Sequence, residues 1–110
     1  MEKSKIETYL GFSIRSRQII FGAEMIERKK KGVYLLVIDG GIGKNSLKTI
    51  LQAQEKLSCT LYITDEGVLA EWVHRPAVKA VAITDKILAS AMIKCADGEP
   101  KFKLYSGGNN

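Results

Sequence analysis

The chain has 110 residues, a mass of 12.2 kDa and a net charge of +5 at pH 7. Its length is typical of one domain, and a composition of 45% apolar and 26% charged residues excludes an intrinsically disordered chain. No apolar run approaches the roughly 20 residues that span a bilayer, and residues 1–10 lack the apolar core of a signal peptide. We therefore expect a cytoplasmic protein without a membrane partner.

Positive charge is concentrated at the start of the chain. Residues 1–32 contain eight basic and four acidic side chains, and so hold four of the five net positive charges. Such a segment favours binding to a polyanion, for which nucleic acid is the most common cytoplasmic candidate. The alternative is that these side chains keep a small protein soluble.

The first 32 residues predict two helices. Ile6, Leu10 and Ile14 recur at helical spacing and predict a helix over residues 5–16. The apolar run at 18–21 is too short to assign, and a glycine follows it as a turn or a helix start. Good helix formers then predict a second helix that ends in basic residues before Gly32.

Residues 33–38 are six consecutive apolar residues. They predict a strand that is covered on both faces, as in parallel sheets. Asp39 and the glycines after it end this strand. Asn45 or Ser46 is expected to cap a third helix, whose apolar stripe reaches Leu57.

Two further strands alternate with two further helices. Residues 59–64 predict a strand, and residues 65–73 predict a short helix with Trp72 on its apolar side. Residues 78–83 predict the next strand, and Thr84 is expected to cap a last helix.

This alternation predicts the fold class α/β, with parallel strand pairing and right-handed crossovers. We expect a three-layer α/β/α sandwich with a mostly parallel or mixed four-stranded sheet. A single domain over residues 1–94 is expected, followed by a partly disordered tail over residues 95–110. Within the tail, residues 101–105 can add an edge strand, and residues 106–110 are expected to be disordered.

The loop between Ile38 and Ser46 is similar to a phosphate-binding loop but lacks two required residues. That pattern needs a glycine five residues before Gly43 and a hydroxyl directly after Lys44. Ile38 and Asn45 occupy these positions, which argues against nucleotide hydrolysis. A glycine-rich turn before a helix can still receive a phosphate through backbone amides, so phosphate contact by this loop stays open.

No residues are spaced as a metal site or a catalytic centre. Cys59 and Cys95 are far apart, and His74 is the single histidine of the chain. Because no nucleophile or acid–base pair stands out, we expect a protein that is not an enzyme and that needs no cofactor and no metal.

Basic side chains on either side of residues 18–27 are expected to meet. Arg15 and Arg17 end the first helix, and residues 28–31 end the second, so six cations can share one edge. Such a patch attracts a phosphate backbone without reading its sequence. Phe12 and Phe21 are expected in the core, which leaves few stacking platforms and favours a shaped RNA over an unstructured strand.

Several segments, in their order and spacing, resemble one family. They are YLGFSIRSRQIIFGAEMIERKKKGVYLLVIDG, KNSLKTI, LYIT and VKAVAITDKILASAMI, and the likeness covers residues 5–94. The chain resembles the superfamily of the large-subunit ribosomal proteins "seven-Ae" and "thirty-e", most closely its small bacterial YlxQ-like branch. This resemblance implies a three-layer α/β/α sandwich. For many members it also implies binding to the kink-turn, a sharply bent internal loop of RNA.

The resemblance further implies which residues contact RNA. The family signature is a glycine, any residue, an asparagine, three residues and a lysine or arginine, and it matches Gly22, Glu24 and Arg28. Glu24 replaces the asparagine, as it tends to do in the YlxQ-like branch, and a carboxylate only accepts hydrogen bonds. A second contact region is the loop from His74 to Pro76. Together with the basic edge, the candidate RNA-binding residues are Arg15, Arg17, Gln18, Gly22, Glu24, Arg28, Lys29, Lys44, His74, Arg75 and Pro76.

We therefore expect a non-enzymatic RNA-binding protein that docks on a structured RNA. Ribosomal RNA, together with ribosomal or assembly proteins, is the expected partner. A protein–protein interaction module of the same fold is the alternative, with Trp72 as an exposed anchor. A third possibility is a small phosphate or nucleotide binder at residues 40–44.

Overall fold

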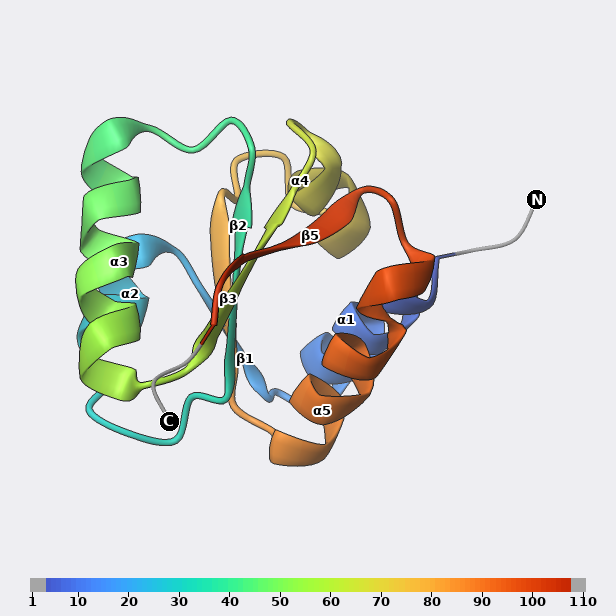
Figure 1. The fold of residues 1–110 in the computed structure, drawn as a ribbon, viewed down its shortest axis with the longest axis horizontal. Helices are drawn as coiled ribbons and strands as arrows, with labels where there is room; N and C mark the ends of the chain where they lie inside the picture. Colours follow the sequence, from blue (N-terminus) through green and yellow to red (C-terminus); the bar gives the residue numbers. More distant parts are fainter. Residues whose placement is uncertain (1–3, 108–110) are drawn as a thin grey trace.

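Apolar runs of the sequence form a buried sheet that helices cover on both faces. The computed structural model describes residues 4–107 and confirms the predicted three-layer α/β/α sandwich, with five strands rather than four (Figure 1). The elements in chain order are α1 (Lys5–Arg15), β1 (Ile19–Phe21), α2 (Ala23–Glu27), β2 (Leu35–Asp39), α3 (Lys44–Leu57), β3 (Thr60–Thr64), α4 (Val68–Val73), β4 (Ala80–Ile83), α5 (Lys86–Cys95), a 3-10 turn (Ala96–Gly98) and β5 (Phe102–Ser106).

The sheet is mixed. Its strand order is β1-β4-β2-β3-β5, in which β2 and β3 are parallel and the other neighbouring pairs are antiparallel. The predicted parallel pairing of β4 is therefore wrong. The 14 residues of α3 rise about 21 Å and carry the chain back along the sheet, whereas the six residues of α4 rise only about 9 Å. Because α4 is too short for that return, β4 starts at the end where β3 stops.

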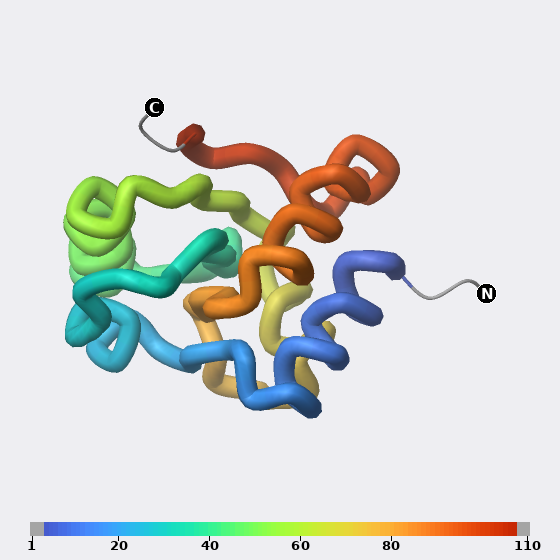
Figure 2. The backbone as a smooth tube through the Cα atoms, turned by 90° about the horizontal axis from the view of Figure 1, so that it is seen from below, coloured from blue at the N-terminus to red at the C-terminus, as the bar shows by residue number. Residues whose placement is uncertain are grey.

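Two apolar cores lie on the two faces of the sheet. Leu10 and Trp72 are buried on the face covered by α1, α4 and α5, and Ile26 and Ile50 are buried on the face covered by α2 and α3. Figure 2 shows α1 beside α5 on the first face, with α2 and α3 across the sheet from them. All five residues of β2 are buried, as predicted for a strand covered on both faces.

Helix α2 is shorter than predicted, since it ends at Glu27 and does not include the basic run. Ile26 is the buried residue of this helix, and residues 28–31 add four adjacent cations without an apolar side chain to hold another turn on the sheet. Lys56 of α3 donates a hydrogen bond from Nζ to the Glu27 carbonyl at 2.7 Å. This bond satisfies a carbonyl that the helix itself leaves free.

Two helices begin at residues other than the expected ones. Gly43, rather than Asn45 or Ser46, is the N-cap of α3. Helix α4 begins at Val68 instead of residue 65, because Gly67 adopts a positive φ of 84° and turns the chain just before it. Within residues 4–107, no helix combines the length and the apolar character needed to span a membrane.

Thr84 binds Gln18, directly before β1, and does not cap α5. Its hydroxyl donates to Oε1 of Gln18 at 3.0 Å, and its N–H donates to the Gln18 carbonyl at 3.0 Å. Asp85 is the N-cap of α5, because its carboxylate accepts the N–H of Ile87 at 2.8 Å and that of Leu88 at 3.3 Å. Gln18, a candidate RNA contact, is thereby engaged at the start of β1.

Residues beyond 94, expected as a tail, contribute a strand to the sheet. The expected edge strand forms as β5, which pairs with β3, and Phe102 is buried with its ring stacked on Tyr62 at 4.5 Å between centroids. Gln54 of α3 donates from Nε2 to the carbonyls of Ser106 at 3.1 Å and Gly107 at 3.3 Å. Of the segment 106–110 that was expected to be disordered, residues 108–110 lie outside the described residues.

A buried carboxylate joins the loops at one end of the sheet. Asp39, the last residue of β2, is 0% exposed. Its Oδ2 accepts the N–H of Gly41 at 2.8 Å and that of Gly67 at 3.0 Å. Its Oδ1 accepts the N–H of Leu69 at 3.1 Å and the hydroxyl of Thr64 at 3.3 Å. One side chain thus fixes the loop after β2 and the start of α4 together.

The surroundings of Asp39 favour its ionised form. Burial is the largest single influence on the pKa of Asp39 and acts to raise it. The N–H groups of Gly67, Gly41 and Leu69, together with the Lys79 ammonium at 3.7 Å from Oδ2, outweigh burial. The pKa of Asp39 therefore lies below its usual value of 3.8.

Asp39→Asn should lower the free energy of unfolding at pH 7 by about 2–4 kcal/mol, because buried N–H donors lose their anionic acceptor. Since the pKa of Asp39 is lower in the folded than in the unfolded state, its contribution is present above about pH 4 and is lost as the pH falls through the lowered pKa. Urea unfolding at pH 7 and pH 3 measures both effects, and the variant should lose less stability between these pH values than the natural chain.

Asp85→Asn is the matched control, because asparagine caps a helix about as well as aspartate does. This variant should change the free energy of unfolding by less than about 0.5 kcal/mol. Equal losses in the two variants would contradict the special role given to Asp39.

Candidate nucleic-acid interface

The start of α2 and the loop after α4 lie side by side at one edge of the sheet. Phe21 is the last residue of β1, and the Arg75 guanidinium lies over its ring at 4.2 Å from the centroid. His74 directs the chain there, because it ends α4 with a left-handed φ of 58°, and the Arg75 N–H donates to the Ala70 carbonyl at 3.0 Å. Arg75 is exposed, so one face of its guanidinium is supported while its donors remain accessible.

Gly22 makes the turn from β1 into α2. Its N–H donates to the Ala80 carbonyl at 2.9 Å, and its φ of 91° with a ψ of 142° requires a residue without a Cβ. A Cβ built at this position would meet no atom within 4 Å. Glycine is therefore needed here for backbone conformation, and the space in front of it is open to a ligand.

A hollow of about 290 Å³ lies in front of this turn. Three segments line it: the end of β1 with the start of α2, the loop before α3 with the first turn of that helix, and the approach to β4 with its first residue. The lining residues are Phe21, Gly22, Ala23, Ile42, Ser46, Ala77, Val78, Lys79 and Ala80. The Lys79 side chain is 42% exposed and is held 3.7 Å from the Asp39 carboxylate. Arg75 and Lys79 thus place two positioned cations beside small, mostly apolar side chains.

His74 and Pro76 stand in the same loop but do not form the hollow. Nε2 of His74 lies 3.6 Å from a carboxylate oxygen of Glu7, near the start of α1. Pro76 is exposed. The loop therefore joins the hollow to α1, and Arg75 is its member that lies over β1.

The predicted basic edge around Gly22 does not form. Arg17 precedes β1 and Gly22 follows it, so the two residues lie about 16 Å apart along the strand direction. The Arg15 guanidinium lies over the ring of Phe12 at 4.8 Å, on α1. Phe12 is 43% exposed, so its expected place in the core is wrong as well.

The basic run after α2 lies at the other end of that helix from Gly22. Arg28 and Lys29 follow the five residues of α2, which rise about 8 Å. Figure 2 shows this segment and α1 on opposite faces of the sheet, so the six cations do not share one edge. Glu24 is exposed in the first turn of α2, close to the hollow.

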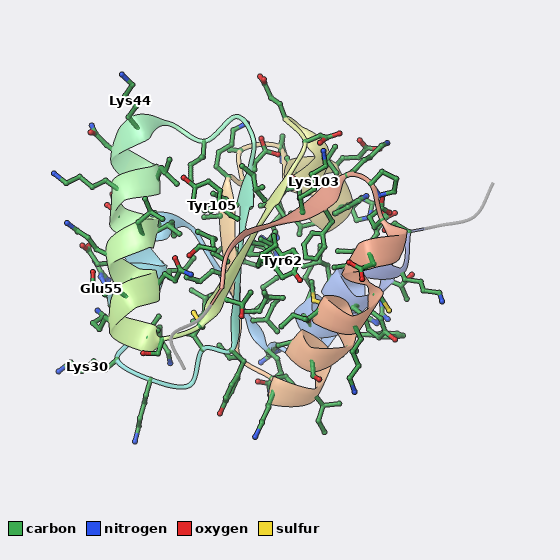
Figure 3. The ribbon with its side chains drawn as sticks, in the orientation of Figure 1. Lys30, Lys44, Glu55, Tyr62, Lys103 and Tyr105 are labelled. Carbon is green, nitrogen blue, oxygen red and sulfur yellow. The ribbon has the colours of Figure 1, made fainter. Side chains whose placement is uncertain are left out.

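Lys44 begins α3, and its side chain extends away from the body of the molecule in Figure 3, where Glu55 lies toward the opposite end of the same helix. The glycines before it have a structural use. A Cβ at Gly40 would lie 2.8 Å from the Thr64 carbonyl oxygen, and the Gly41 N–H is bound to Asp39. Because the Gly41 amide of this loop already binds the buried Asp39 carboxylate, it is not available to a phosphate, which weakens the interpretation of the loop as a phosphate site.

Phe21 and Lys79 were not among the sequence candidates. Phe21 was expected in the core because its apolar neighbours in β1 gave no indication of a partner for its ring. Lys79 directly precedes β4, and its proximity to Asp39 depends on the antiparallel pairing of β4 with β2. A charged residue near the start of the otherwise apolar run over residues 77–83 was the available signal.

The two cysteines lie apart from this edge. Cys59 is buried directly before β3, and burial raises its pKa to about 11, so its thiol stays protonated at neutral pH. Cys95 ends α5 and is partly buried. Among residues 4–107, no group of three or more His, Cys, Asp or Glu side chains is placed to hold a metal ion.

Comparison with solved structures supports the fold. Among those that match, a protein of unknown function from Bacillus halodurans superimposes with a TM-score of 0.75 over 86% of this chain and 99% of that chain, at 16% sequence identity. No protein-family model matches the chain, and no curated protein matches it. At this identity the likeness shows the shared architecture alone.

Gly22→Ala should lower the free energy of unfolding by about 1–2 kcal/mol, because an L side chain is strained at a φ of 91°. The far-UV spectrum should not change, since the added Cβ meets no atom within 4 Å. Gly98→Ala is the control, because a Cβ at Gly98 is also unobstructed and its φ is not positive. Urea unfolding compares the two variants, and equal effects would contradict the strain argument.

Proposed function

We propose that this protein is a non-enzymatic, cytoplasmic RNA-binding protein that docks on a structured RNA through the edge formed by Phe21, Gly22, Arg75 and Lys79. The observation that carries the proposal is the Arg75 guanidinium, held on the Phe21 ring at 4.2 Å beside an unobstructed glycine turn. A guanidinium supported on one face keeps its planar set of donors for phosphate oxygens or for a guanine edge.

The shape of this edge favours RNA that is bent or has unpaired bases. The hollow beside Arg75 has apolar walls and one positioned ammonium, Lys79. Unstacked bases of loops and bulges are recognised by stacking on aromatic rings and guanidinium planes, whereas a regular duplex hides its bases. Phosphate contacts by the two cations would position such an RNA without fixing its sequence.

The resemblance to the kink-turn superfamily supports the same edge. It implies two contact regions, the turn at Gly22 and the loop at Arg75, which are separated by about fifty residues in sequence and adjacent in the fold. Glu24 limits the RNAs that fit, because its carboxylate repels phosphate and cannot donate a hydrogen bond to a base. Ribosomal RNA, with ribosomal or assembly proteins nearby, is the proposed partner class.

The alternative, a protein-docking module, depended on Trp72 as an exposed contact residue. Trp72 is 6% exposed, and its ring lies 6.3 Å from the Phe102 centroid inside the core. A residue this buried contributes to folding and does not reach a partner. The expectation that Trp72 is an exposed anchor is therefore wrong.

Arg75→Ala should weaken RNA binding about three- to tenfold and reduce the slope of log affinity against log salt by about one, because one phosphate contact is lost. Fluorescence anisotropy measures this with two labelled probes, a kink-turn hairpin and a fully paired hairpin of equal length. The kink-turn hairpin should bind more tightly, since the hollow suits a bent RNA with exposed bases.

Arg17→Ala is the matched control, because it removes the same charge at the far end of β1. It should alter affinity and salt slope much less than Arg75→Ala. Equal effects would indicate attraction to net charge alone. Binding no stronger than that of a neutral protein of the same size, at low salt and with both probes, would refute the proposal.

A further inference from the structure

The edge of the sheet opposite β1 is formed by β5, and within residues 4–107 no strand pairs with its outer side. The Asp65 N–H donates to the Lys101 carbonyl at 3.1 Å, so the pair 65/101 is a hydrogen-bonded pair of the antiparallel ladder. Because bonded and non-bonded pairs alternate, the pair of Tyr62 with Leu104 is non-bonded. The N–H and carbonyl of Leu104 therefore point outward, away from β3.

Exposed side chains accompany this free backbone. Leu104 is 57% exposed and Tyr105 is 44% exposed. Figure 3 shows Tyr105 and Lys103 on β5, at the front of the molecule, with no helix in front of them. An open strand edge with an exposed aliphatic and an exposed aromatic residue is a template for another strand.

A hollow of about 650 Å³ continues from this edge at the end of β5. Leu104, Tyr34 and Ile93 give it apolar walls, and the side chains of Lys30, Lys31 and Lys56 lie at its rim. Lys103 lies on β5 itself, so the β5 edge and this hollow together carry four lysines. Burial and the nearby Asp97 carboxylate raise the pKa of Tyr62, one of the lining residues, so Asp97 lies close to the hollow. No Asp or Glu is among the lining residues, so cations are in excess there.

We propose that the β5 edge and this hollow bind an extended acidic segment of a partner protein, which adds to the sheet as a sixth strand. Main-chain hydrogen bonds to Leu104 would hold the segment, and alternate apolar side chains would enter the hollow. Its carboxylates would meet the lysines at the rim.

The same observations disfavour two other occupants. A second copy of this chain would bring the lysines of two edges together, and like charges on paired edges are destabilising. RNA gains nothing from the free backbone of Leu104 or from aliphatic walls. The β5 edge also lies four strands from β1, about 19 Å away, so it is separate from the proposed RNA-binding edge.

The test uses a fluorescein-labelled peptide of alternating valine and glutamate. This peptide should bind the full chain, and two control peptides should bind about tenfold more weakly: one with lysine in place of glutamate, and one with central prolines that cannot pair. Hydrogen exchange of the Leu104 amide should be fast in the free protein and slow in the complex. Equal binding of the proline peptide, or unchanged exchange at Leu104, would overturn the proposal.

Variants separate the backbone contact from charge. Leu104→Pro removes the outward N–H and should weaken peptide binding about tenfold, whereas Leu104→Ala keeps it and should weaken binding less. Lys103→Glu should weaken binding about fivefold, and Lys48→Glu, on α3, should not. If Leu104→Pro unfolds the protein, the comparison of Lys103→Glu with Lys48→Glu and the hydrogen exchange of the Leu104 amide still test the proposal.

Two further measurements address the other occupants. The kink-turn hairpin should not displace the peptide, and sedimentation should show a monomer for the natural chain. Displacement by RNA would assign the groove to nucleic acid. A dimer that Leu104→Pro dissociates would assign the edge to self-association. Either result overturns the proposal, and neither depends on whether the Arg75 edge binds RNA.

Discussion

The architecture of one whole end of this molecule depends on the Asp39 carboxylate. It is fully buried and bound by backbone donors from two separate loops, with the Lys79 ammonium beside it. A buried charge is tolerable only when its hydrogen bonds are complete, so the glycines that let these loops approach are part of the same constraint. By fixing Lys79, the carboxylate also sets one wall of the hollow in front of Gly22. The stability of the fold and the geometry of the candidate RNA edge therefore share one interaction.

Local patterns in the sequence were enough to predict most elements, and long-range geometry accounts for the rest. The apolar runs at 33–38 and 59–64 became β2 and β3, and the crossover helix between them made this pair parallel, as expected. The direction of β4 followed instead from the length of α4, which no single residue reveals. Strand β5 depends on the stack of Phe102 on Tyr62, which are forty residues apart. Caps were misplaced because Thr84 and Asp85 are both good cap residues, and tertiary contact with Gln18 decided between them.

The candidate site was also predicted only in part from the sequence. Gly22 and Arg75 were named from the resemblance, and the fold brings their loops together. The supporting ring of Phe21 was not foreseen, because a partly buried aromatic residue in a short apolar run has the same sequence signature as a core residue. The prediction that Arg15, Arg17 and residues 28–31 share one edge was wrong, because β1 and α2 lie between these cations and hold them apart. The two open edges lie at opposite sides of one sheet, and each combines cations with a hollow that has apolar side chains in its walls.

The direction of the helices gives the charge distribution a further meaning. Helices α1 and α3 both begin at the Gly22 end of the sheet, since Glu7 of α1 reaches His74 there and Ser46 of α3 lines the hollow. The backbone dipoles of these two helices therefore point the same way, with their amide ends at the Gly22 end of the sheet and their carbonyl ends at the opposite end. Arg15 and Lys56 stand in the last turns of these helices, where cations offset carbonyl charge. Part of the basic excess therefore offsets the carbonyl charge at the ends of these two helices.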